Sequence, residues 1–116
     1  MPFIHYDQIE REYVTPQHST AYGALAAGEA IEVGLLTFKG GEGAKPHQHP
    51  HEQIVVVLKG RIRVSIGDEE QELGPGSGFQ VPPNVPHGTT ALEDSEVLSC
   101  KNLIDGKGHR ISCSRD

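Results

Sequence analysis

The fold is decided by residues 46–58, which read PHQHPHEQIVVVL. Three of the chain's seven histidines, His47, His49 and His51, lie within five residues here, and the most apolar run of the sequence follows at once. Side chains two positions apart on an extended strand point to the same face. We therefore expect these imidazoles and the amide of Gln53 to project toward one point at the mouth of a core strand.

This cluster indicates a metal site. Neutral imidazole suits divalent transition metals, and an amide or carboxylate oxygen beside it adds a further ligand. His87 lies further along the chain, after the rigid proline-rich approach of residues 82–86. The alternative interpretation is a polar, His-rich surface loop, but the apolar strand that follows places the cluster at the edge of the core. We expect one divalent transition metal per subunit, with Fe, Mn, Ni and Zn as the candidates.

Turn residues divide the chain into short apolar runs, as is typical of all-β proteins. The 14 glycines and 8 prolines fall mostly between these runs. Expected strands span residues 31–38, 53–58, 61–66, 71–73, 79–81, 96–103 and 109–113. A tight hairpin turn is expected at Lys59-Gly60, and a second turn at residues 67–70. Residues 1–30 are expected to be a strand and loop arm, because Gly23 and Gly28 interrupt the helical propensity there. Short strands at regular spacing favour a sandwich or barrel.

Length, charge and cysteine content limit the remaining possibilities. A chain of 116 residues supports one domain, residues 1–116. Its net charge of −6, without a cluster of Lys or Arg, argues against nucleic acid and anionic membranes as partners. No apolar run approaches the ~20 residues of a membrane span, and the first residues lack the pattern of a signal peptide. Cys100 and Cys113 fit reduced thiols in a cytoplasmic protein better than a disulfide scaffold.

Two motifs resemble those of the cupins. They are Gly41-x5-His47-x-His49-x3-Gln53-x6-Gly60 and Gly76-x5-Pro82-x-Asn84-x2-His87. The resemblance covers residue 41 to about residue 98. It implies a double-stranded β-helix, or jelly-roll, barrel that holds one metal near its open end. It also implies a homodimer to which the N-terminal segment contributes.

The resemblance places the metal ligands at His47, His49, Gln53 and His87. The six-residue gap before the motif glycine selects Gln53 over its neighbour Glu52. Strand alternation agrees, because Glu52 would point away from the face that the histidines share. His51 has the same parity and competes as a ligand. We expect it to lie beside the site or at its rim, because a proline disturbs the strand just before it.

Two residues depart from the family pattern. Asn84 stands where the family usually has Gly, a mild change because Asn tolerates a left-handed turn. Gln53 stands where the family usually has Glu. A neutral amide leaves the full charge on a divalent ion and makes it a stronger Lewis acid toward a bound oxygen. This favours non-redox chemistry, in which a metal polarises a carbonyl or stabilises an enolate.

The substrate is expected to contact side chains that surround the metal. Val55 and Val57 share the parity of Gln53 and should form an apolar wall. Either Phe79 or Gln80, whichever faces inward, should border the metal. Thr89 can donate a hydrogen bond to a substrate oxygen, and His51 completes this set. Lys101 and His109 can reach the barrel mouth, although no pattern fixes their direction, and no catalytic residue is assigned.

Residues 91–98, ALEDSEVL, look like the cupins of pectin and alginate breakdown that convert unsaturated uronates to keto sugars. Those relatives also use Gln as the fourth ligand. After the segment that resembles residues 91–98 they continue with an acidic residue, an aromatic residue and an Arg that serve catalysis, and these three are absent from residues 99–105. The leading interpretation is a metal-dependent enzyme that performs isomerisation, ketonisation or lyase chemistry on a small oxygenated carbon compound. The alternatives are a dioxygenase that uses Fe(II) and O2, and a non-enzymatic cupin that binds or senses a small ligand.

Overall fold

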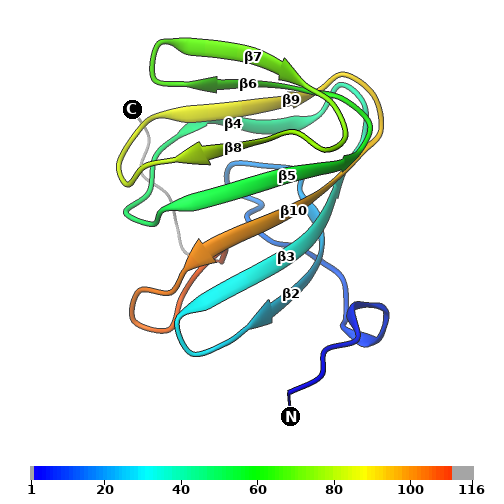
Figure 1. The fold of residues 1–116 in the computed structure, drawn as a ribbon, viewed down its shortest axis with the longest axis vertical. Helices are drawn as coiled ribbons and strands as arrows, with labels where there is room; N and C mark the ends of the chain where they lie inside the picture. The colour runs from blue at the N-terminus through cyan, green and yellow to red at the C-terminus, as the bar shows by residue number, and fades with distance from the viewer. Residues whose placement is uncertain (1, 111–116) are drawn as a thin grey trace.

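Two antiparallel sheets face each other in the computed structural model, which describes residues 2–110 (Figure 1). The first sheet has six strands in the order β1-β2-β3-β10-β5-β8, and the second has four in the order β4-β9-β6-β7. Neighbours in each sheet are mostly distant in sequence, as in a jelly roll. The expected all-β jelly-roll fold is therefore confirmed.

The described elements begin with one turn of 3-10 helix, η1 (Tyr6–Gln8), and continue with ten strands. The strands of the described chain are β1 (Glu12–Tyr13), β2 (Tyr22–Ala27), β3 (Ile31–Phe38), β4 (Gly43–His47), β5 (Gln53–Lys59), β6 (Ile62–Ile66), β7 (Glu69–Leu73), β8 (Gly78–Val81), β9 (His87–Ala91) and β10 (Ser95–Asn102).

Six expected strands, from 31–38 to 96–103, agree with β3, β5, β6, β7, β8 and β10 within two residues at either end. The strand expected at 109–113 is wrong where it can be compared, because residues 109 and 110 form a turn. Residues 111–113 of that expectation lie outside the described residues. Within the N-terminal arm, β1 and β2 extend the six-stranded sheet beside β3.

The tight hairpin expected at Lys59-Gly60 is also wrong. β5 pairs with β10 and β8, whereas β6 pairs with β7 and β9 in the other sheet. Gly60, with φ +86°, carries the chain around a corner between the two sheets. A corner and a hairpin both need a residue with positive φ, so the local sequence does not separate them. The hairpin in this region joins β6 to β7 through Gly67.

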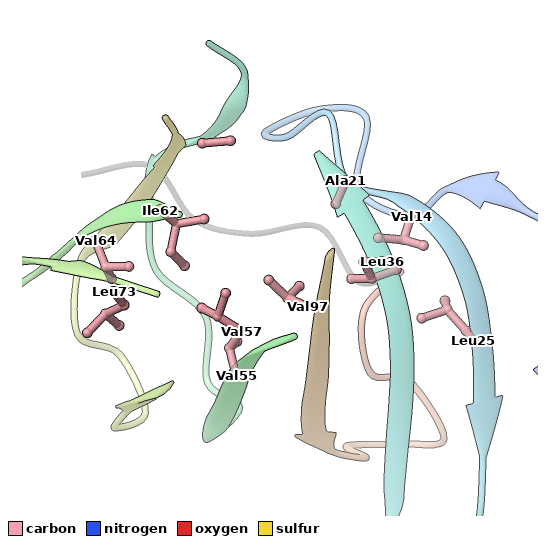
Figure 2. Packing of buried hydrophobic residues seen from close by; sticks show 11 residues of the cluster. Val14, Ala21, Leu25, Leu36, Val55, Val57, Ile62, Val64, Leu73 and Val97 are labelled. Atoms are coloured by element: carbon pink, nitrogen blue, oxygen red, sulfur yellow. The ribbon is translucent and has the colours of Figure 1, made fainter. Parts of the chain in front are cut away.

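Strand pairing separates an apolar part of the barrel from a polar one. In the register of β5 with β10, Val57 lies opposite Val97, whereas Gln53 lies opposite Lys101. Figure 2 shows Val57 and Val97 extending from one sheet toward Ile62 of the other, and these three side chains are at most 2% exposed. The inward positions near Gln53 are instead polar, so a functional site is expected at that end.

The outer face of the six-stranded sheet exposes Ile31, Ile54 and Leu58. Apolar side chains gathered on an open sheet face favour contact with another surface. The homodimer expected from the sequence stays a prediction, with this face as its candidate contact. No helix among residues 2–110 is long and apolar enough to cross a membrane.

The corner at Gly60 should tolerate no side chain. A Cβ there would lie 2.5 Å from the carbonyl oxygen of Asp94, whereas a Cβ at Gly76, which has nearly the same φ of +87°, would meet nothing within 4 Å. Gly76→Ala should therefore cost only the backbone strain, about 1 kcal/mol. Gly60→Ala should cost roughly 1–3 kcal/mol more, because the backbone must shift. Urea unfolding of both variants checks this, and equal losses would contradict it.

Candidate metal centre

Three imidazoles meet at the polar end of the barrel. His47 ends β4 and pairs with His87 at the start of β9, while His49 lies in the loop between β4 and β5. One ring nitrogen from each lies within 4.8 Å of the other two. The rings of His47 and His49 lie 4.3 and 4.7 Å from that of His87, centre to centre. All three side chains are buried.

A backbone carbonyl two residues away holds the Nδ1 atom of each imidazole. The pairs are His47 with Lys45 at 2.5 Å, His49 with His51 at 3.0 Å and His87 with Val85 at 2.9 Å. A carbonyl oxygen only accepts a hydrogen bond, so this pattern favours the ring proton on Nδ1. The Nε2 lone pair is then the one that can bind a metal, an arrangement common among metal-binding histidines.

Gln53 begins β5 and brings an amide to the same point. Its Nε2 donates to the hydroxyl of Ser99 at 2.9 Å. Its Oε1 lies 3.0 Å from Nε2 of His49. The amide oxygen is therefore directed at the histidines and the amide nitrogen away from them.

The position of His49 reveals what this arrangement can hold. Burial, reinforced by the positive charge of Lys101, lowers the pKa of His49 to about 3, so its ring carries one proton at neutral pH. Yet its two nitrogens each lie 3.0 Å from an oxygen, those of His51 and Gln53. With the proton on Nδ1, His49 Nε2 and Gln53 Oε1 are two acceptors in contact, which is unfavourable unless a cation takes both lone pairs.

The residues present fit a divalent transition metal. Ligand atoms at right angles, each at ~2.1 Å from an ion, lie about 3.0 Å apart. This is the separation between His49 Nε2 and Gln53 Oε1. Three imidazoles and one amide oxygen are also the donors that such ions accept. The structure brings the four expected ligands together, and their roles as ligands stay a prediction.

His51 lies behind this cluster. Its side chain is fully buried, its ring stands edge-on to His49 at 5.8 Å, and its Nε2 lies 2.9 Å from the carbonyl oxygen of Lys107. Its Nδ1 has no hydrogen-bond partner within residues 2–110. The ring of His51 thus contacts the ring of His49, and its backbone carbonyl oxygen accepts a hydrogen bond from His49 Nδ1. Both contacts agree with a place beside the site.

A cavity of about 60 Å³, measured as room for the centre of a water molecule, adjoins the candidate ligands. Of the residues expected to contact substrate, Val55, Phe79 and Thr89 line it. Val57 packs in the apolar core instead. Gln80 is exposed on the outside of the barrel, where its amide donates to Glu52 at 2.9 Å. Phe79 is therefore the inward-facing member of the Phe79/Gln80 pair.

Several polar residues of the site are not evident from sequence motifs. Ser99, Lys101 and His109 line the cavity, and Glu32 contacts His109 at 2.7 Å. These four side chains are all buried. Alternation gives a signal for Glu32, since it occupies an inward position of an apolar strand, where a charge is unusual. His18, whose ring stacks on that of His47 at 5.4 Å, gives no such signal.

The fold and the histidine cluster together define an all-β barrel with a candidate metal centre. The profile of the cupin domain family matches residues 34–100. The chain therefore belongs to the cupins, as its two motifs indicated.

Individual relatives agree with this assignment. The chain is similar to H2HPP isomerase of Bacillus subtilis, with 38% identity over 56 residues, which are 47% of this chain and 24% of that protein. It is 33% identical over 94 residues to auxin-binding protein 4 of Zea mays, across 70% of this chain and 46% of the other. The chain thus aligns with less than half the length of either relative.

Among solved structures, the chain is similar to KdgF from Halomonas sp. The TM-score is 0.77 with 28% identity, covering 88% of this chain and 93% of the other. This similarity agrees with the resemblance to the uronate-ketonising cupins that the sequence indicated.

Metal binding should depend on the histidine cluster. The purified protein is expected to hold about one divalent transition metal per subunit, lost on chelation. His47→Ala combined with His49→Ala should abolish binding and leave a folded barrel, because the cluster lies at the rim of the core. His5→Ala, at an exposed histidine, is the control. Elemental analysis checks this, and unchanged metal content in the double variant would show that the ligand assignment is wrong.

The metal-free protein should lose stability in acid. Burial lowers the pKa of His109, and the hydrogen bond from His109 lowers the pKa of Glu32. At acidic pH the unfolded chain therefore binds more protons than the folded chain. As a result, the free energy of unfolding decreases as the pH is lowered. The loss should begin below about pH 6.5 through histidine and continue below about pH 4.5 through Glu32. His109→Gln should flatten the first part in urea titrations with chelator. An unchanged slope would contradict this.

Proposed function

We propose that the protein is a metal-dependent enzyme that isomerises a small oxygenated carbon compound. The substrate would bind the metal through a carbonyl and a neighbouring hydroxyl or carboxylate. The observation that carries this proposal is a candidate ligand set without an anion, made of three imidazoles and the amide of Gln53. A bound divalent ion would keep its full charge there and supply Lewis-acid polarisation of a substrate carbonyl.

The cavity supports a small substrate. A single water needs roughly 10–15 Å³ by the same kind of measure, so about 60 Å³ corresponds to a few water molecules. Val55 and Phe79 give it an apolar wall that limits the entry of water. Exclusion of water strengthens the electrostatic interactions within such a site.

The charges around the cavity favour a substrate with a carboxylate. Lys101 lines the cavity beside the candidate metal ligands, with its side chain buried. An ammonium group and a divalent ion beside one cavity would attract an anion. The name of the Bacillus subtilis relative, an isomerase, is in keeping with this chemistry.

A second candidate function is the binding of a small ligand without turnover. The observation in its favour is the similarity to auxin-binding protein 4, whose alignment covers 70% of this chain. The two functions differ in one measurable property. Tight binding of a small carboxylic acid without chemical change supports the binding protein, whereas exchange or rearrangement of the compound supports the enzyme. Oxygen consumption during turnover would instead favour a dioxygenase.

The neutral amide should matter more for turnover than for metal affinity. Gln53→Glu is expected to retain or tighten metal binding, because a carboxylate is the better donor to a divalent ion. Its negative charge should weaken polarisation of the substrate oxygen. Enolisation should then fall at least about tenfold, or about 1.4 kcal/mol in the barrier. Deuterium uptake into pyruvate and dihydroxyacetone, followed anaerobically by NMR, measures this.

Gln80→Glu is the matched control, since it makes the same change on the exposed outer face of the neighbouring strand. It should leave both metal content and exchange unchanged. Undiminished anaerobic exchange in Gln53→Glu would remove the reason for preferring Lewis-acid chemistry. A gain of oxygen-dependent activity in that variant would favour the dioxygenase.

A further inference from the structure

A continuous chain of hydrogen bonds runs from Glu32 to the candidate metal centre. Oε1 of Glu32 lies 2.7 Å from Nδ1 of His109, and Nε2 of His109 lies 2.8 Å from Oγ of Ser99. Ser99 in turn contacts Nε2 of Gln53 at 2.9 Å. β3, β10 and β5, adjacent in the sheet, supply Glu32, Ser99 and Gln53, and the segment after β10 supplies His109.

We propose that Glu32, His109 and Ser99 are positioning residues that hold the Gln53 amide with its oxygen toward the histidines. The inference rests on the proposed metal site and explains how this chain orients its unusual fourth ligand. A side-chain amide has an acceptor, its oxygen, and a donor, its NH2 group, and only the oxygen can bind a cation. Something must therefore choose between two orientations that differ by a half-turn of the side chain.

The direction of each hydrogen bond follows from the previous one. Glu32 accepts from both the backbone N–H and the Nδ1–H of His109, at 2.6 and 2.7 Å. The buried imidazole of His109 is neutral, and its one N–H, on Nδ1, donates to Glu32. Its Nε2 can therefore only accept a hydrogen bond. Ser99 must then donate its single hydrogen to His109. The oxygen of Ser99 is left as an acceptor, and Gln53 must donate to it.

The reversed amide would be penalised at the Ser99 end, and at the ligand end whenever a cation is bound there. Its oxygen would face the oxygen of Ser99, whose hydrogen is already used, and its NH2 group would face the candidate ligands. A buried polar group without its partner costs roughly 1–3 kcal/mol. Ser99 and His109 are only 1% and 3% exposed, so water is poorly placed to relieve the mismatch.

Removing the Ser99 hydroxyl should loosen the amide and weaken the metal. Ser99→Ala is expected to lower Co(II) affinity, measured by competition with a chelator, at least fivefold and to change the visible spectrum of the bound ion. Ser99→Thr restores a hydroxyl and should recover most of both. Ser95→Ala is the matched control, because Ser95 is a buried serine at the other end of the same strand. Its hydroxyl oxygen accepts a hydrogen bond from the backbone N–H of Arg61. It should leave affinity and spectrum unchanged.

A double-mutant cycle separates positioning from general structural support. In a Gln53→Ala background, Ser99→Ala should have no further effect on Co(II) affinity or spectrum, because the group it positions is gone. Equal losses in both backgrounds would overturn the proposal, as would a Ser99→Ala protein with wild-type affinity and spectrum. If the wild type binds no Co(II), the proposed metal site fails and this inference with it.

A measurement on the unaltered protein guards against variants that do not fold. Long-range proton–nitrogen NMR reports which nitrogen of His109 carries the proton. The proposal requires the Nδ1–H form at neutral pH. An Nε2–H form would make His109 the donor to Ser99, reverse the chain and overturn the proposal.

Discussion

The candidate site depends on a shortage of protons at His49. Its neutral ring has one N–H to share between two oxygens, each 3.0 Å away. Burial, with the charge of Lys101, keeps a second proton off the ring at neutral pH. When His49 Nδ1 donates its hydrogen bond to the carbonyl oxygen of His51, its Nε2 has only a lone pair to offer. Both atoms of the 3.0 Å contact between His49 Nε2 and Gln53 Oε1 are then acceptors. A divalent cation bound by both atoms would resolve this conflict.

The jelly roll brings such a site together from distant parts of the chain. His47 and His87 pair across two strands of the small sheet, while Gln53 lies on the large sheet beside Lys101. The apolar core at Val57 and Val97 holds the two sheets together and leaves one end of the barrel for polar groups. Buried polar chains are stable when every member has a partner. Glu32, His109 and Ser99 meet that condition through their hydrogen bonds, and at Gln53 the amide nitrogen does.

Motif spacing and strand alternation predicted much of this. The period of two placed His47, His49 and Gln53 on one face, and the order of two motifs placed His87 with them. The role of Glu32 could not be predicted, since its partner His109 is 77 positions away in the chain and local patterns carry no such information. The residues Lys59-Gly60 predict a hairpin where the structure has a corner, because turn residues indicate a backbone angle and not which sheet the next strand joins.

The most direct test concerns the proton of His49 in the metal-free protein. Long-range proton–nitrogen NMR at pH 6 identifies the protonated nitrogen of each histidine. We predict a neutral His49 with its proton on Nδ1, so that Nε2 and the Gln53 oxygen are both acceptors that can bind a cation. A proton on Nε2, donated to Gln53, would satisfy the pair without a metal and contradict the account.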